Sequence, residues 1–170
     1  MNYKLIVLAP STGGKSTLMR YLREHTDLHV VETDEAVMKA NNNVWPDDNN
    51  YKDQVLLPKV TNEIIKQDDV LFIASYIPTE LLRTAKERGF KIIILQLTLE
   101  ELKRRNAKRM NEESYDDATP WFKGQLENYQ RLTQEGLVDN TIDGHQSISQ
   151  IVGEITRLID SKPSAKEITL

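Results

Sequence analysis

The amino-acid sequence predicts an α/β fold in three layers, with a five-stranded parallel sheet covered by helices on both faces. Short apolar runs alternate with longer segments of helical periodicity along the 170 residues, which is typical of strands joined by crossover helices. The first run, residues 3–9, is apolar and β-branched and is too short for a typical helix. It leads through a glycine-rich turn into a helical pattern. These observations indicate strand, loop and helix in a repeating order.

In the first half of the chain, strands are predicted at residues 3–9, 28–32 and 70–74, and helices at 15–25, 34–40 and 52–66. Leu18, Met19 and Leu22 recur at helical spacing in the first of these helices. Pro58 is expected to kink the third helix, because proline lacks the backbone N–H that a helix interior needs. The asparagine-rich stretches at 41–43 and 49–50 are expected to form mobile turns.

In the second half, strands are predicted at residues 90–97 and 138–142, and helices at 79–88, 99–110, 119–134 and 148–159. Pro78 suits a first helical turn, and Gly89 suits a left-handed residue at a helix end. Thr98 is expected to cap the helix at 99–110, and Glu101 to complete a capping box with it. Residues 111–118 form an acidic loop, and Thr119 and Pro120 begin the next helix.

The composition indicates one domain, residues 1–161, followed by a flexible tail at 162–170. The apolar runs are too short to span a bilayer, and the chain leads straight into a strand without a signal peptide, so a cytoplasmic location is predicted. The absence of cysteine excludes disulfides and thiolate metal sites, and three scattered histidines do not suggest a zinc cluster. A net charge of -4 argues against a general nucleic-acid binder.

Residues 9–16, APSTGGKS, match the phosphate-loop pattern [AG]-x-x-x-x-G-K-[ST], with alanine where the stricter pattern has glycine. A strand that runs into a helix start aims free N–H groups and the positive end of the helix dipole at an anion. The residues expected to bind nucleotide phosphates are Ser11, Thr12, Gly13, Gly14, Lys15, Ser16 and Thr17. Lys15 can bridge the β- and γ-phosphates, and the Ser16 hydroxyl can ligate Mg²⁺.

Other motifs separate the classes of phosphate-loop protein. A GTPase would carry Asp-x-x-Gly and Asn-Lys-x-Asp, and the sequence has no convincing match to either. A motor ATPase usually has acidic residues at the end of a core strand, whereas the strand at 70–74 runs into Ser75. What remains resembles the small P-loop kinases, the group that includes nucleoside monophosphate, shikimate and gluconate kinases. This resemblance implies an enzyme that uses ATP and Mg²⁺.

Four segments carry the resemblance and cover most of the chain from residue 4 to residue 159: APSTGGKST, VVETDEAV, IASYIPTELLRTAKERGFKIIILQL and LTLEELKRRNAKRM. VVETDEAV resembles the Asp-x-Asp of shikimate-type kinases, with Glu32 in the first position and Asp34 in the second. The resemblance implies that Asp34 orients or deprotonates the acceptor hydroxyl and that Glu32 helps to hold Mg²⁺ through water. The sequence does not rank these two roles. Both carboxylates could instead be solvated turn residues.

Five basic residues crowd the helix end that precedes the acidic loop: Lys103, Arg104, Arg105, Lys108 and Arg109. Arg105 and Arg109 lie four residues apart and therefore share a helix face. The resemblance implies a lid, about residues 104–118, that closes on nucleotide and brings catalytic arginines to the transferred phosphoryl group. Bound ATP is expected to supply the anionic partner that Arg105 and Arg109 lack. The alternative is a solvated basic face.

The sequence thus predicts an ATP- and Mg²⁺-dependent kinase that acts on a small-molecule or nucleotide acceptor. Trp45, Trp121 and Phe122 are candidates for the acceptor pocket, although aromatic residues are more often core. One alternative is a kinase that acts on a nucleic-acid hydroxyl, since polynucleotide kinases share the loop. Another is a nucleotide-binding regulatory protein with little turnover. The sequence predicts neither the acceptor nor the oligomeric state.

Overall fold

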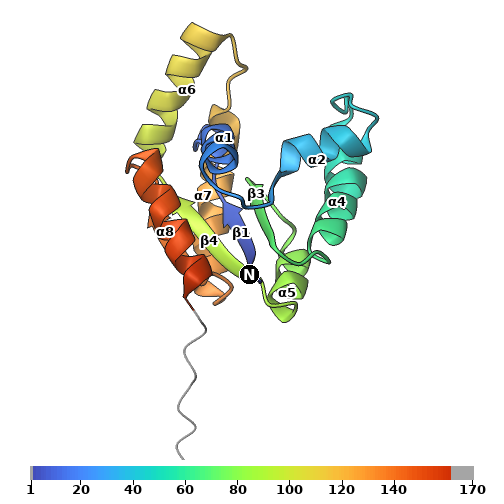
Figure 1. Cartoon of the computed structure of the whole chain (residues 1–170). Coiled ribbons are helices and arrows are strands. Elements are labelled where there is room, and N and C mark those ends of the chain that lie inside the picture. The colour runs from blue at the N-terminus through green and yellow to red at the C-terminus, as the bar shows by residue number, and fades with distance from the viewer. Residues whose placement is uncertain (1, 162–170) are drawn as a thin grey trace, which may run out of the picture.

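A five-stranded, all-parallel sheet lies at the centre of the protein (Figure 1). The computed structural model describes residues 2–161, so the tail predicted at 162–170 lies outside the described residues. The sheet order is β2-β3-β1-β4-β5, formed by β1 (Lys4–Leu8), β2 (Val30–Glu32), β3 (Val70–Ala74), β4 (Lys91–Gln96) and β5 (Asn140–Asp143). Helices cover both faces, so the predicted fold class is confirmed.

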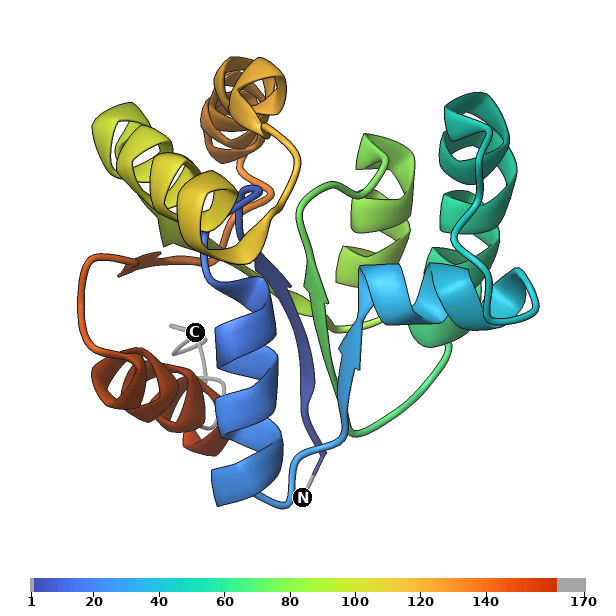
Figure 2. The ribbon, with the colours of Figure 1, turned by 90° about the horizontal axis from the view of Figure 1, so that it is seen from above.

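Helices lie on both sides of the sheet (Figure 2), and each face of the sheet buries its own set of side chains. Leu5 and Val7 of β1 pack on the side that carries α1 (Lys15–His25) and α8 (Ile148–Asp160). Ile6 and Leu8 pack on the opposite side, against residues of α5 (Thr79–Glu87) and α7 (Thr119–Gln134). Successive strand residues point to opposite faces, so burial of both faces requires the uninterrupted apolar run seen in the sequence.

The strand order places the ends of β1, β2 and β3 at one edge of the sheet. β1 lies between β3 and β4, and the chain crosses from β1 to β2 in one direction and from β3 to β4 in the other. In open parallel sheets, ligands bind at the carboxyl ends of the strands where the order reverses.

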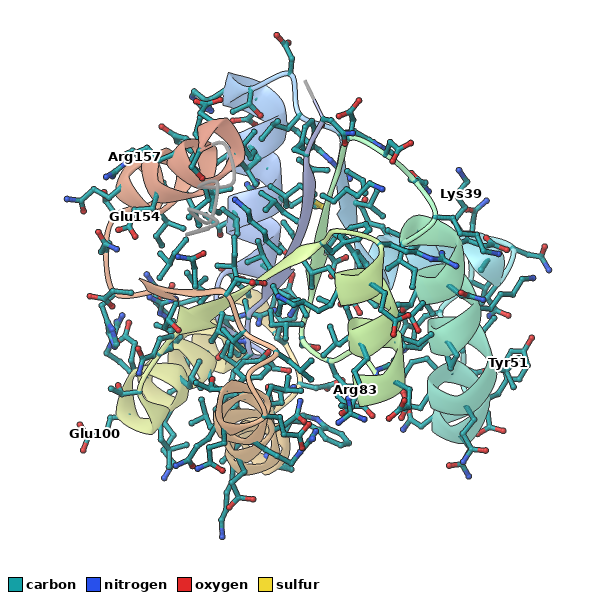
Figure 3. The ribbon with its side chains drawn as sticks, turned by 90° about the horizontal axis from the view of Figure 1, so that it is seen from below. Lys39, Tyr51, Arg83, Glu100, Glu154 and Arg157 are labelled. Atoms are coloured by element: carbon teal, nitrogen blue, oxygen red, sulfur yellow. The ribbon has the colours of Figure 1, made fainter. Side chains whose placement is uncertain are left out.

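The helices turn polar side chains outward, as Lys39, Glu100 and Arg157 show at the rim of the molecule (Figure 3).

The predicted helix at 52–66 begins earlier, at Asn49, and changes from α-helical to π-helical geometry and back along its length. The chain forms a short helix α3 (Asn49–Tyr51), a π-helical turn η1 (Lys52–Leu56) and then α4 (Leu57–Ile64). Pro58 lies in the first turn of α4, directly after the π-helical turn, so the regular α-helical pattern is interrupted next to the proline. Because proline cannot donate, the turn before it widens, and Leu57 N–H donates to Lys52 O.

Helix α6 (Leu99–Glu113) is longer than the predicted 99–110 and ends at Ser114, which has a left-handed φ of 55°. Thr98 caps α6 as predicted, accepting a hydrogen bond from Glu101 N. The predicted capping box is wrong, because the Glu101 carboxylate pairs with Arg104 and Arg105 instead. The short helix α2 (Thr33–Ala40) follows β2 directly and is capped by Glu32. Within residues 2–161, no helix is both long and apolar enough to span a membrane.

Candidate active site

The turn between β1 and α1 leaves the start of α1 open. Thr12 and Gly14 have positive φ values of 59° and 93°, and Gly13 N–H donates to Pro10 O over 2.8 Å. Within residues 2–161, no side chain caps the first turn of α1. Its leading N–H groups are therefore directed toward the space outside the helix, together with the positive end of the helix dipole. This arrangement can bind an anion.

Two glycines are required in this turn for different reasons. A Cβ on Gly13 would lie 2.6 Å from Pro10 O and 2.9 Å from Pro10 Cδ, which is closer than atoms can approach. Gly14 has space for a Cβ, but its φ of 93° is one that residues with side chains rarely adopt. The Gly-Gly pair in the sequence therefore follows from the backbone path.

Two helices that come much later in the chain hold the turn. Thr12 Oγ1 donates to Leu102 O of α6 over 3.3 Å. Gln125 of α7 makes a two-point contact with Ser11: Ser11 N donates to Gln125 Oε1 over 2.8 Å, and Gln125 Nε2 donates to Ser11 Oγ over 2.9 Å. Gln125 was not among the predicted site residues, because a single polar residue on an amphipathic helix gives no sequence signal.

One cavity, of about 480 Å³, lies between the turn and α6. The turn side is formed by Ser11, Thr12, Gly14, Lys15, Ser16 and Thr17. Basic side chains line much of the remaining wall: Arg20, Arg104, Arg105, Lys108 and Arg109. Its lining contains two acidic residues, Asp34 and Glu113. The excess of positive charge suits a ligand with several negative charges, such as a nucleoside triphosphate. We call this space the basic cavity.

A second cavity, of about 550 Å³, lies on the other side of the turn. Ser11, Lys15 and Asp34 line both cavities, so the two spaces meet at these residues. Trp45 and Trp121 line the second cavity, as the sequence suggested for an acceptor pocket. Phe122 does not, since it is fully buried in a core cluster with Leu97 and Leu102. We call this space the aromatic cavity.

Lys15 stands at the junction of the two cavities. Burial lowers the pKa of its ammonium group from the ordinary lysine value, while the carboxylates of Asp34 and Glu32 act in the opposite direction. The two carboxylates therefore offset only part of the effect of burial on this ammonium group. A phosphate group placed against Lys15 would stabilise that charge further.

Glu32 lies at the end of β2, next to Ile73 of β3, and is 5% exposed. Its Oε2 accepts a hydrogen bond from Glu35 N over 3.1 Å, while its Oε1 is buried without a hydrogen-bond partner among the described residues. Burial raises the pKa of the Glu32 carboxyl, and the charge of Asp34 adds to this effect. The residue that follows β3 is Ser75, so β3 itself carries no acidic residue at its end. Because β2 and β3 are neighbours, Glu32 places a carboxylate close to this position.

An unpartnered, buried carboxylate oxygen fits a cation or a water bound to a cation. Within residues 2–161, no group of three or more histidine, cysteine or acidic side chains is arranged to hold a metal ion by itself. A single buried carboxylate oxygen of this kind suits a cation such as Mg²⁺, which keeps several waters and takes most other ligands from phosphates. The exposed Ser16 side chain, in the first turn of α1, is available as a further oxygen ligand.

The two predicted lid arginines differ in their contacts. Arg105 already has an anionic partner, because its Nε donates to Glu101 Oε1 over 2.8 Å and its Nη2 donates to Gly144 O over 3.1 Å. Hydrogen bonds from Arg104 and Arg105 hold the pKa of Glu101 at about 2. The expectation that Arg105 lacks a partner is therefore wrong. The Arg109 guanidinium carbon lies 4.0 Å from the ring centroid of Tyr115, a cation–π contact.

The segment predicted as a lid is fastened at its far end. Asn106 is 4% exposed, and its Oδ1 accepts a hydrogen bond from Ala118 N over 2.9 Å. Its Nδ2 donates to Asp117 Oδ1 over 2.7 Å and to Thr119 Oγ1 over 3.2 Å. Between these anchor points, residues 107–116 are exposed except for Arg109, which is half-buried. Within the predicted lid, the stretch 107–116 is therefore the part with the most exposed side chains.

Comparison with known proteins identifies the fold. No protein-family model matches the sequence, and no similar sequence was found among curated proteins. The structure is similar to shikimate kinase from Acinetobacter baumannii in complex with shikimate, with a TM-score of 0.72, 17% identity and 92% of each chain covered. It is also similar to a gluconokinase from Sinorhizobium meliloti, with a TM-score of 0.58, 14% identity, and 92% of this chain and 93% of that chain covered.

A third similar structure is the YorR protein from Bacillus subtilis in complex with phosphorylated GDP. Its TM-score is 0.60 at 16% identity, with 91% of this chain and 94% of that chain covered. The likenesses show that this chain has the fold of the small P-loop kinases. The resemblance predicted from the four sequence segments is confirmed at the level of the fold.

The glycine requirement gives a first prediction. Gly13→Ala should weaken ATP binding at least about tenfold, because the new Cβ displaces Pro10 and with it the N–H groups of the turn. Gly153→Ala is the matched control, since a Cβ there meets nothing within 4 Å and alanine favours the surrounding helix α8. Calorimetric titration with ATP measures both variants. Wild-type affinity in Gly13→Ala would contradict the assignment of the turn as the phosphate site.

Proposed function

We propose that this chain is a kinase that transfers the γ-phosphoryl group of ATP to the hydroxyl group of a small molecule, with Mg²⁺ as the metal ion. The observation that carries the proposal is the meeting of two unlike cavities at Lys15 and Asp34. One is basic and begins at a turn suited to phosphates, and the other is aromatic and uncharged over most of its lining. A donor and an acceptor bound in these cavities would meet at one lysine and one carboxylate.

In this proposal the basic cavity holds the triphosphate of ATP. The open start of α1 and Lys15 bind the β- and γ-phosphates, and Ser11, Thr12, Gly13, Gly14, Ser16 and Thr17 shape the cradle. A small cavity of about 200 Å³ continues past Gly14 and is lined by Leu95, Arg105, Gly144 and Ile148, among others. Apolar side chains beside an arginine suit a purine ring, so we assign this space to adenine.

The transfer step requires one bond to form and one to break. The acceptor hydroxyl oxygen attacks the γ-phosphorus, the bond between that phosphorus and the bridging oxygen breaks, and ADP leaves. Asp34 orients the hydroxyl and takes its proton, which then passes to solvent. Lys15 stays beside the phosphates and offsets the charge that develops on the leaving oxygen.

Two arginines of α6 complete the proposed site. Arg105 is held in place by Glu101 and Gly144, so it contributes a fixed positive charge at the base of the cavity. Arg109 has no carboxylate within salt-bridge distance among the described residues and is held only by Tyr115. It is therefore the arginine that is able to move toward the transferred phosphoryl group.

Mg²⁺ would be held by the Ser16 hydroxyl and, through water, by Glu32, whose buried Oε1 otherwise lacks a partner among the described residues. When bound, it supplies positive charge that neutralises the phosphate oxygens. The regulatory alternative is favoured by the lack of an acidic residue at position 75, after β3. The carboxylate of Glu32, beside β3, can take the place of that residue, and this weighs against a protein with little turnover. A cytoplasmic location remains a prediction from the sequence.

A second prediction tests the function directly. Lys15→Ala should reduce turnover at least about a hundredfold through loss of the charge at the reacting phosphates, while its fold is retained. Asp34→Asn should lower kcat by about a hundredfold or more with little change in the affinity for ATP. Arg157→Ala, on the outer side of α8, is the control for loss of a surface charge. A coupled ADP assay with a panel of hydroxyl acceptors measures all three.

Full turnover in Lys15→Ala would contradict the phosphate-loop assignment. A collapse of ATP affinity in Asp34→Asn would move Asp34 to the metal and make Glu32 the better candidate base. ATP binding without ADP release for any acceptor would favour the regulatory alternative. Strong turnover with oligonucleotides alone would favour the nucleic-acid kinase.

A third prediction concerns the lid. Adding Mg²⁺ and a non-hydrolysable ATP analogue should slow amide exchange in residues 107–116, because bound phosphates give Arg109 an anionic partner. Residues 117–119 should change little, since Asn106 already fastens them. Arg109→Ala should weaken the slowing, and Lys103→Ala, on the exposed side of α6, should not. Exchange that nucleotide leaves unchanged would mean that the basic end of α6 is only a solvated face.

A further inference from the structure

Charge is divided unequally between the two cavities. The basic cavity has four arginines in its lining, whereas none of the described residues that line the aromatic cavity is an arginine. The basic residues of the aromatic cavity are Lys15 and Lys52, and its acidic residues are Asp34 and Asp53. The two lysines and two aspartates balance in charge. The lining thus has no excess charge to attract an ionic acceptor.

Neither lysine of the aromatic cavity is an unopposed positive charge. Lys15 belongs to the phosphate turn and faces the transferred group. Lys52 Nζ lies 3.4 Å from Asp53 Oδ1 and 5.6 Å from the ring centroid of Trp45. A carboxylate or phosphate on the acceptor would compete with Asp53 for Lys52 and would find no arginine fork among the described residues of the lining. The lining therefore disfavours acceptors that carry such groups.

Three aromatic side chains line the cavity and keep much of their surface open. Trp45 is 44% exposed, Tyr76 is 45% exposed and Trp121 is 60% exposed. These three rings around one cavity leave apolar surface for a ligand to cover. Aromatic faces bind flat rings by stacking and accept many different rings.

The polar groups of the lining divide into engaged and available ones. Gln125 is occupied by Ser11, and Thr33 Oγ1 donates to Ile73 O. The Asn49 side chain makes no hydrogen bond with the described residues, and Asn128 uses its Oδ1 to accept from Arg131. Carboxamides offer both donors and acceptors without charge. They can pair with the edge of a ring that carries carbonyl and N–H groups.

From these observations we infer that the acceptor is an uncharged molecule with a flat, hydrogen-bonding ring and a free hydroxyl group, the chemistry of a nucleoside. The inference rests on the proposed kinase function and names the substrate class of the same site. Trp45, Tyr76 and Trp121 stack on the ring, and Asn49 and Asn128 read its edge. The hydroxyl lies toward Asp34, where the γ-phosphoryl group of ATP is transferred to it with release of ADP.

The chain provides its own reporter for this inference. Trp45 and Trp121 are the two tryptophans of the sequence, and both line the aromatic cavity. Tryptophan fluorescence is therefore measured while nucleosides with different bases are added to the full chain without ATP. The matched ligands are the corresponding nucleoside monophosphates, shikimate and gluconate as acids, and an aminoglycoside as a polycation. At least one nucleoside should give a saturable change with a Kd at least tenfold lower than that of every charged ligand.

Two variant pairs link the signal to the cavity. Trp121→Ala should raise the Kd of that nucleoside about tenfold, whereas Trp121→Phe, which keeps a stacking ring, should raise it no more than about threefold. Tyr76→Ala and Tyr76→Phe form a second pair that leaves both tryptophans in place. Unchanged affinity in both alanine variants would overturn the inference. So would tighter binding of any charged ligand, or no saturable response to any nucleoside.

The fluorescence and activity measurements test the nucleoside site and the kinase function separately. If nucleosides bind with the expected preference but no ADP is released in the presence of Mg²⁺ and ATP, the aromatic cavity is a nucleoside-binding site, but the proposed kinase function fails and nucleosides are not its phosphate acceptors. If ADP is released only with shikimate, gluconate or another acid, the kinase function holds and the inference about the acceptor is overturned.

Discussion

The rest of the site depends on how the backbone turns from β1 into α1. The turn has to leave the first N–H groups of α1 unpaired within the chain, and it does so through a positive φ at Thr12 and Gly14 and a close approach at Gly13. Such a turn is not stabilised by its own hydrogen bonds alone. Contacts from Leu102 and Gln125 hold it from two helices that lie more than 85 residues further along the chain. The conformation of this turn therefore depends on contacts from distant parts of the chain.

This arrangement leaves a few polar groups in unfavourable surroundings. Lys15 is partly buried, which lowers the pKa of its ammonium group, and Glu32 keeps a carboxylate oxygen buried without a partner among the described residues. Both features cost stability in the free protein, and both would be relieved by a phosphate and a cation. The difference in charge between the two cavities also matches the ligands that are proposed for them. Arginines gather where a triphosphate is expected, while aromatic rings and amides line the side where the reacting hydroxyl is expected.

The local sequence predicted the parts of this site that depend on neighbouring residues. The glycine turn at residues 9–16, the position of Glu32 at the end of β2 and the basic residues of α6 all follow from short patterns and helical spacing. The contacts of Gln125 with Ser11 and of Asn106 with Asp117 join distant segments, so no periodicity indicates them. The pairing of Glu101 with Arg105 was predictable from its spacing of four residues, but the capping-box pattern competed with it. Buried contacts decided which rings became core and which lined the cavity.

A crystal structure with Mg²⁺ and a non-hydrolysable ATP analogue tests the central claim most directly. We expect the terminal phosphate within hydrogen-bond distance of Lys15 Nζ and facing Asp34, with the metal beside Ser16 and the adenine near Gly144. The aromatic cavity should remain open to solvent on the far side of Lys15. Nucleotide bound elsewhere, with the turn at residues 9–16 empty, would contradict the account.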